Sequence, residues 1–164
     1  SDSGGKKVGI ISGYKDTCCA GERTRGVLDA LADTDYEIQF TINVTYETSI
    51  TEMFMQQKPV DYLIVLETGI LEEIAKILSD KQENGMKVYG IGSSIKCVYY
   101  LDEAVIDGLI VVDGYDMGYQ SVLQISDMLK KRLHRTKDQA TDYRLLHRED
   151  IFSEDTQKFL YTFY

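Results

Sequence analysis

The sequence has little proline, little cysteine and no tryptophan among its 164 residues. The single proline, Pro59, argues against a disordered linker protein. Cys18 and Cys19 are adjacent and Cys97 stands alone, so the cysteines provide neither a disulfide framework nor the spacing of a zinc site. The longest apolar runs, such as 62–66, are far too short to cross a bilayer. The composition that remains is typical of a globular domain with a hydrophobic core.

Positive charge is also scarce. Eighteen Lys and Arg residues stand against 27 Asp and Glu residues, which gives a formal net charge of −9 at pH 7. A protein with this balance repels polyanions, so we expect no direct contact with nucleic acid. The length fits one domain, and we expect residues 6–164 to form it, with residues 1–5 as a linker or a mature boundary.

Short apolar segments alternate with amphipathic segments along most of the chain. The starts of successive apolar segments are about 21 to 30 residues apart, which is the length that a strand, a helix and two loops require. Predicted strands cover 6–12, 36–44, 62–66, 87–91 and 108–112, and predicted helices cover 22–31, 47–57 and 71–78. The sequence therefore predicts an α/β fold: a doubly wound, Rossmann-like or flavodoxin-like, mostly parallel sheet of about five to six strands with helices on both faces.

The last third of the chain has a different pattern. A long amphipathic helix is predicted over 118–133, with Val122, Ile125 and Leu129 on one side. The basic residues at its end complement the helix dipole, which favours a solvated cap over a phosphate site. A polar loop, a late strand at 143–146 and a very apolar tail follow.

Sequence motifs for catalysis and cofactor binding are missing. Gly90-Ile91-Gly92 lacks the third glycine of a dinucleotide fingerprint, and there is no P-loop and no Gly-x-Ser-x-Gly elbow. A phosphoacceptor receiver domain needs an Asp after the third strand, where this chain has Glu67. We therefore expect no catalytic residues, no metal site, no cofactor and no enzyme activity.

Four stretches, taken together and in order, resemble one known family. They are VGIISGYKDTCCAGERTRGVLDAL, KPVDYLIVLETGILEEIAKIL, KVYGIGSSIKCVYYLDEAVIDGLIVVDGYDMGYQSV and LLHREDIFSEDTQKFLYTF. The chain resembles the second, C-terminal lobe of the type I periplasmic binding proteins and of the related effector domains of LacI-type repressors. Its most specific parts are the run DGLIVVDGYDMGYQSV and the tail.

The resemblance implies a small-molecule ligand, usually a sugar or another polar metabolite, held between two similar lobes. Residues 114–135 then correspond to the crossover helix, which normally packs on a first lobe that is missing here, and 143–164 to the return strand and tail. An incomplete cleft of this kind should expose apolar surface around Val122 and Leu129, which favours association between copies, such as a homodimer.

The resemblance also points to the site residues, although the usual polar clamp for sugar hydroxyls is mostly replaced. Gly21, Gly92 and Val112 stand where sugar-binding members place polar side chains. The remaining candidates follow the predicted strands: Tyr14, Asp16, Glu67, Ser93, Ser94, Asp113 and Tyr115. The acids favour a cationic or polyhydroxylated ligand, and each of them is also a residue type that caps helices.

The sequence thus favours a sugar-like solute-binding domain of an ABC transporter's substrate-binding protein or of an extracytoplasmic sensor, with a membrane transporter or receptor as partner. One alternative is the effector-binding or dimerisation domain of a cytoplasmic LacI-type regulator. The other is an interaction module whose pocket has degenerated.

Overall fold

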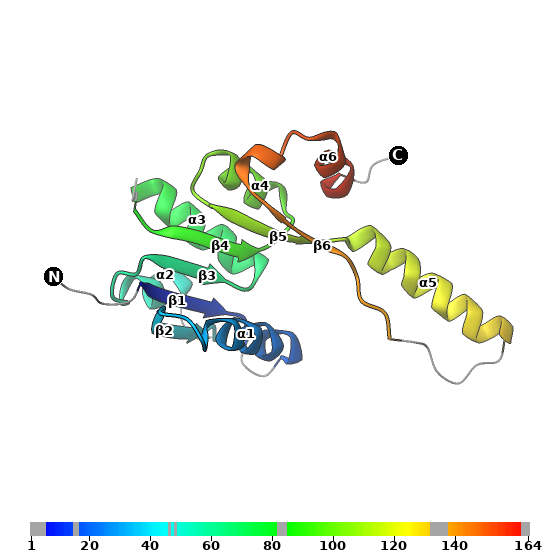
Figure 1. The fold of residues 1–164 in the computed structure, drawn as a ribbon, viewed down its shortest axis with the longest axis horizontal. Coiled ribbons are helices and arrows are strands. Elements are labelled where there is room, and N and C mark those ends of the chain that lie inside the picture. Colours follow the sequence, from blue (N-terminus) through cyan, green and yellow to red (C-terminus); the bar gives the residue numbers. More distant parts are fainter. Residues whose placement is uncertain are drawn as a thin grey trace.

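The computed structural model describes residues 6–14, 17–45, 47, 49–81, 85–131 and 138–161. Its centre is a six-stranded sheet in the order β2-β1-β3-β4-β5-β6 (Figure 1). The strands are β1 (Lys7–Ser12), β2 (Glu37–Asn43), β3 (Tyr62–Val65), β4 (Lys87–Ile91), β5 (Gly108–Val112) and β6 (Tyr143–Leu146). The first five strands are parallel and β6 pairs antiparallel with β5. The predicted doubly wound, mostly parallel α/β architecture is confirmed.

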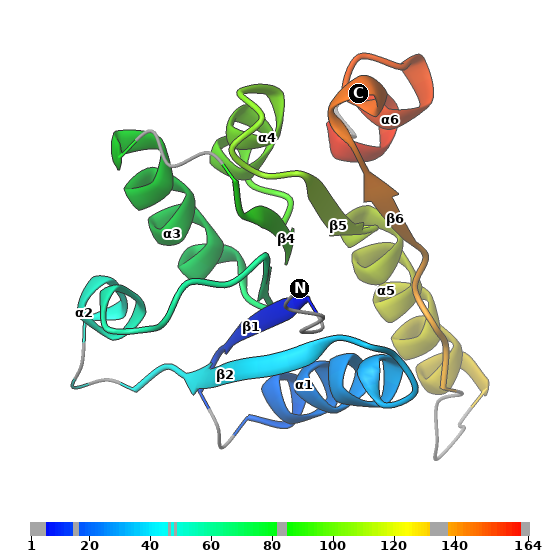
Figure 2. The same cartoon turned by 60° about the vertical axis from the view of Figure 1, so that its left-hand side comes forward.

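Within the described residues, six α-helices surround or leave this sheet. They are α1 (Cys18–Leu31), α2 (Ile50–Met55), α3 (Thr68–Lys81), α4 (Ile95–Asp102), α5 (Gly114–Lys131) and α6 (Glu154–Leu160), and a single 3-10 turn spans Arg148–Asp150. In Figure 2, α1 lies beside β1 and β2, whereas α2, α3 and α4 group on the other side of the sheet. One face of the sheet is therefore covered by α1 and the other by α2, α3 and α4.

Three helices, α1, α3 and α5, begin earlier in the sequence than their apolar periodicity predicted, and one helix was missed. Helix α1 begins at Cys18 because the side chain of Thr17 accepts a hydrogen bond from the backbone N–H of Ala20 at 3.4 Å. Helix α5 begins at Gly114, directly after β5 and one residue, Asp113. Helix α4 was not predicted at all.

The main core lies between the sheet and helices α2, α3 and α4. Its fully buried side chains include Leu63 and Leu109 from the sheet, Leu71 and Ile74 from α3, and Leu101 from α4. Close packing here depends on Gly90, because a Cβ at this position would lie 2.6 Å from Cδ2 of Leu71. The core thus fixes α3 tightly against β4 and sets the position of the loops at the strand ends.

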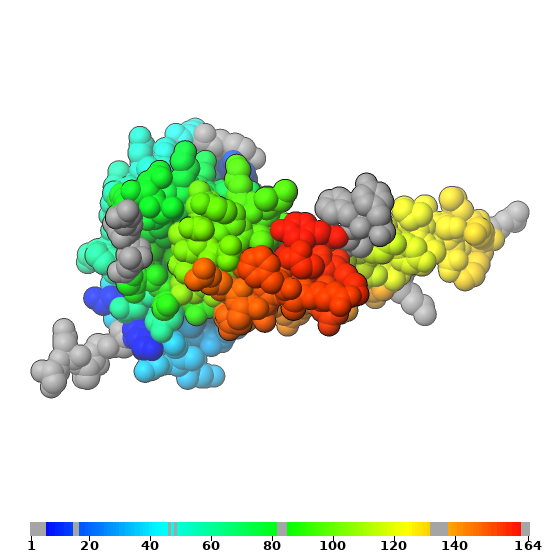
Figure 3. All heavy atoms as spheres, turned by 90° about the horizontal axis from the view of Figure 1, so that it is seen from above, coloured from blue at the N-terminus to red at the C-terminus, as the bar shows by residue number. Residues whose placement is uncertain are grey.

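Helix α5 contributes no residue to the main core. None of its residues is buried, and Val122 and Leu129 are 68% and 77% exposed, as predicted. The helix projects beyond the rest of the molecule in Figures 1 and 3. The residue before β6 lies beside the residue before α5, since the N–H of Asp113 donates a hydrogen bond to the carbonyl of Asp142 at 3.0 Å. Among the described residues, no helix combines the length and the apolar character needed to span a membrane.

Candidate ligand-binding site

A cavity of about 560 Å³ opens at the carboxyl ends of β1 and β3. This is the edge at which ligands bind in open parallel sheets, because the loops and helix N-termini that follow the strands meet there. Its lining comes from the loops after β1, β2 and β3 and from the first turns of α1, α2 and α3: Gly13, Tyr14, Thr17, Cys19, Ala20, Arg23, Val44, Ile50, Leu66, Glu67, Gly69, Ile70 and Glu73.

Glu67 lies half-buried in this cavity and caps α3. Its Oε2 accepts hydrogen bonds from the backbone N–H groups of Gly69 at 2.8 Å and of Ile70 at 3.3 Å. A carboxylate at a helix N-terminus also interacts favourably with the helix dipole. Both bonds use the same oxygen, so Oε1 is not consumed by the cap.

Arg23 is a cavity residue that the sequence reasoning did not select. It comes from the second turn of α1, and its Nη1 donates to the backbone carbonyl of Leu66 at 2.8 Å. This bond holds the guanidinium beside the end of β3, with the remaining N–H groups of the fork as further donors. Glu73 from α3 lines the same cavity. In the sequence, Arg23 lies within Glu22-Arg23-Thr24-Arg25-Gly26, part of the first of the four stretches that resemble the periplasmic binding proteins.

Two other predicted site residues cap helices along the same edge. Ser94 Oγ accepts from the N–H of Cys97 at 3.2 Å, at the start of α4. The Ser94 hydroxyl also hydrogen-bonds the carboxyl of Glu72, and this bond, ahead of the ammonium of Lys96, holds the pKa of Glu72 below its ordinary value. Asp113 Oδ1 accepts from the N–H of Asp116 at 2.8 Å, at the start of α5.

The structure therefore brings some of the predicted residues together and leaves others apart. Tyr14 and Glu67 share the cavity, whereas Ser93, Ser94, Asp113 and Tyr115 follow β4 and β5 farther along the same edge and do not line it. Asp16 falls outside the described residues.

Tyr115 is 62% exposed and its ring stacks on that of Tyr119, with centroids 6.0 Å apart. This places it on α5 rather than at the cavity. In the described part of the chain, no group of three or more His, Cys, Asp or Glu side chains is arranged to hold a metal ion.

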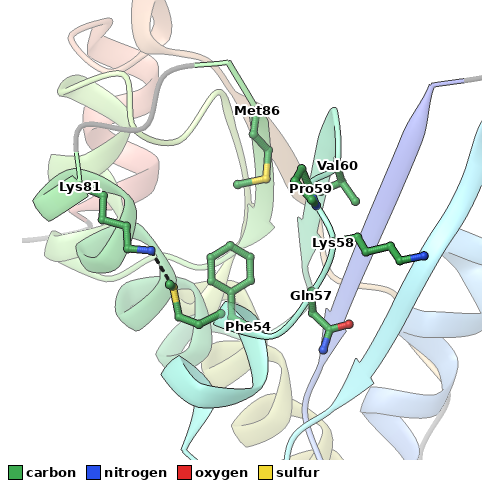
Figure 4. Close-up of a pocket in the computed structure, with 8 residues that line it drawn as sticks. Phe54, Gln57, Lys58, Pro59, Val60, Lys81 and Met86 are labelled. Carbon is green, nitrogen blue, oxygen red and sulfur yellow. Dashed lines mark hydrogen bonds between the residues drawn. The ribbon is translucent and has the colours of Figure 1, made fainter.

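A second hollow of about 340 Å³ lies at the opposite, amino-terminal edge of the sheet (Figure 4). Its walls are largely apolar, with Phe54 and Met86 facing the space. The ammonium of Lys81 is directed at the sulfur of Met55, 2.7 Å away. No cluster of polar groups converges on this hollow comparable to that around Glu67 and Arg23, so the carboxyl-edge cavity is the better candidate.

Comparison with known proteins shows what this fold is. No protein-family model matches the sequence, and no curated protein matches it. Solved structures do match. One is a carbohydrate transporter solute-binding protein from Agrobacterium radiobacter in complex with D-arabinose, with a TM-score of 0.83 at 16% identity over 96% of this chain and 56% of that chain. The chain has the fold of one lobe of a type I periplasmic binding protein.

Two further solved structures also match most of this chain with a little over half of their own length. A solute-binding protein from Bacillus halodurans with bound myo-inositol has a TM-score of 0.78 at 15% identity and covers 94% of this chain and 55% of that chain. A chain from Bacteroides fragilis assigned as a LacI transcriptional regulator has a TM-score of 0.70 at 15% identity, covering 90% and 54%. The present chain thus spans a little over half the length of these proteins.

Proposed function

We propose that this chain is a ligand-binding lobe for a small polyhydroxylated solute, acting in a solute-binding protein outside the cytoplasm that delivers to a membrane transporter or receptor. The observation that carries the proposal is the cavity at the carboxyl edge of a sheet whose fold is that of sugar-binding lobes. The solved relatives are described with D-arabinose and myo-inositol, both of which are rich in hydroxyl groups.

The chemistry of the cavity supports this ligand class. Arg23 offers hydrogen-bond donors, and the carboxylates of Glu67 and Glu73 offer acceptors, so a sugar or cyclitol hydroxyl can donate to one side and accept from the other. Tyr14 adds an aromatic ring next to the polar groups. Because Glu67 and Arg23 are held by backbone partners, little side-chain entropy is lost when a ligand binds.

The experiment is a melting-temperature screen with D-arabinose, D-galactose, D-tagatose and myo-inositol, followed by calorimetry on any hit. A ligand at a hundred times its Kd adds about 2.7 kcal/mol, which raises the melting temperature by about 5 to 10 °C for a domain of this size. No shift with any member of the panel would overturn the proposal.

Variants test whether the cavity is the site. Glu73→Gln removes a carboxylate that lines the cavity, and we expect it to weaken binding at least tenfold with little change in the unfolding free energy. The matched control is Glu37→Gln, an exposed carboxylate at the amino end of β2. If both variants bind like the parent chain, the cavity does not hold the ligand.

The effector domain of a cytoplasmic LacI-type regulator is the second candidate, because the Bacteroides fragilis regulator has the same fold. Its ligand chemistry would be the same, and the net charge of −9 disfavours DNA contact through this domain itself. Detection of the protein outside the cytoplasm by fractionation would decide for the solute-binding protein.

A further inference from the structure

Helix α1 forms one wall of the candidate cavity, yet apolar packing holds it to the sheet only weakly. Thr17, Cys19, Ala20 and Arg23 line the cavity from the N-cap and the first two turns of this helix. Within this helix, all of which is described, only Ala20 is buried, whereas helix α3 buries a row of apolar side chains beside the same cavity. Polar contacts therefore contribute much of what fixes α1 in place.

A buried hydroxyl at the end of β1 makes one of these contacts. Ser12 is the last residue of β1 and is fully buried although its side chain is polar. Its Oγ accepts a hydrogen bond from Thr24 Oγ1 at 3.0 Å, and it lies 3.4 Å from the carbonyl oxygen of Ala20, to which it can donate. Thr24 Oγ1 lies 2.8 Å from the same carbonyl oxygen. We call the two hydroxyl residues the Ser12–Thr24 pair.

The pair resists movement of the helix. Each hydroxyl has one proton, so two protons are shared among the two hydroxyl oxygens and the Ala20 carbonyl. A shift of α1 along the sheet would separate Ser12 from both of its partners on the helix. The hydroxyl would then be buried without a hydrogen bond, which is costly.

The residue next to Thr24 makes a second contact with the sheet. Arg23 Nη1 donates to the carbonyl of Leu66, directly after β3, at 2.8 Å. The N–H of Leu66 in turn donates to the carbonyl of Ile11, the residue before Ser12, at 2.8 Å. Adjacent residues of α1 are thus bound to the ends of the neighbouring strands β1 and β3. Two such contacts fix both the position of the helix and its rotation about its own axis, which one contact alone would leave free.

We propose that Ser12 and Thr24 are positioning residues of the ligand site, which hold α1 so that Arg23 and the first turns of the helix keep their places in the cavity wall. The effect on binding rests on the proposed function. Neither residue of the pair lines the cavity, so both act through α1 and not through contact with the ligand. A wall that is already in place when the ligand arrives costs no ordering free energy on binding, and the pair therefore raises the affinity.

The variants remove one hydroxyl at a time. Ser12→Ala cuts the contact between β1 and α1, while Thr24 keeps the Ala20 carbonyl as its partner, so no buried polar group is left unpaired. Thr24→Val removes the other hydroxyl at nearly constant volume, and Thr24→Ser restores it. The matched control is Thr156→Val, because Thr156 is the other buried polar residue in the described part of the chain and lies in α6.

The first measurement needs no ligand. NMR of the side-chain nitrogens of Arg23 reports how fast its guanidinium rotates, and the hydrogen bond to the Leu66 carbonyl slows this rotation. We expect the rotation to be about three to ten times faster in Ser12→Ala and Thr24→Val, the factor that corresponds to the loss of one hydrogen bond. It should stay unchanged in Thr24→Ser and Thr156→Val. A rotation rate in Ser12→Ala and Thr24→Val equal to that of the parent chain would overturn the proposal.

The second measurement is calorimetry with whichever of D-arabinose, D-galactose, D-tagatose and myo-inositol binds the parent chain. Ser12→Ala and Thr24→Val should raise its Kd by about three- to tenfold, whereas Thr24→Ser and Thr156→Val should bind like the parent. An equal loss of affinity in Thr156→Val would show that lower stability alone weakens binding, and the positioning role would be wrong. Urea unfolding verifies that every variant folds.

The two proposals fail separately. If none of the four solutes binds the parent chain, the proposed function is overturned, and the rotation of the Arg23 guanidinium still decides whether the Ser12–Thr24 pair positions this side chain. If a solute binds the parent and all four variants equally well, the proposed function stands and the positioning role is overturned.

Discussion

Replacing Glu67 by Ala separates its structural role from its role in binding. The substitution removes an acceptor that takes two backbone N–H groups, from Gly69 at 2.8 Å and from Ile70 at 3.3 Å, and it removes a negative charge from the N-terminus of α3. Loss of a helix cap costs about 1–2 kcal/mol, and the charge–dipole interaction accounts for about 0.3–1 kcal/mol of such effects. We therefore expect the unfolding free energy to fall by about 1–2 kcal/mol.

The assay is urea unfolding followed by circular dichroism, with thermal melting as a second measurement. For a chain of this size the expected loss lowers the melting temperature by about 2–8 °C. Glu67→Gln keeps an oxygen acceptor and loses only the charge, so it should cost less than half as much. Glu73→Ala, from the same cavity, serves as the control. A Glu67→Ala variant as stable as the control would refute the cap and leave ligand binding as the reason for this carboxylate.

Three further outcomes are expected. Gly108→Ala should destabilise the fold by about 1–3 kcal/mol in urea, because its Cβ would lie 2.7 Å from the ring of Tyr89; an unchanged midpoint would contradict this. A thiol reagent should label two of the three cysteines in the folded chain and all three in denaturant, since Cys97 is buried and burial raises the pKa of its thiol; fast labelling of a third would be the contrary result. Because the pKa of Glu72 is lowered, the stabilisation that its carboxylate contributes to the fold is present above the ordinary glutamate pKa of about 4.3 and is lost as the pH falls through the lowered value. Ser94→Ala should therefore shift the NMR titration of the Glu72 carboxyl to higher pH. An unchanged titration would argue against the hydrogen bond between Ser94 and Glu72.

The strands β1, β3, β4 and β5 were predictable because each is a short, mostly apolar run, the pattern of a strand in a parallel sheet, whereas β2 was predictable from its alternation of apolar and polar residues. The strands β4 and β5 match the predicted bounds at both ends. Helix α4 was missed because Ile95–Asp102 is short and includes Val98, Tyr99 and Tyr100, residue types with low intrinsic helix propensity. Its formation depends on the Ser94 cap and on burial of Leu101, and burial is a property of the assembled fold.

The candidate site was only partly predictable for a similar reason. Glu67 and Asp113 could be selected because they follow predicted strands, and their capping of the next helix is a local property of the sequence. Arg23 could not be selected, since its contact with the carbonyl of Leu66 joins segments 43 residues apart. Such a contact exists only after β1 and β3 have paired and α1 has packed beside them.

The antiparallel strand β6 joins the sheet late during synthesis, because it is translated well after its partner strand β5. It completes the sheet beside β5 and contributes Leu146, which is only 3% exposed, to the main core, yet it follows β5 by about 30 residues with all of α5 in between. At the ribosome, β5 therefore emerges as an unprotected sheet edge and stays so until the returning segment has been translated. A pause or a truncation inside α5 would leave that edge free to pair with another nascent chain, so translation rate through this helix bears directly on the yield of folded protein.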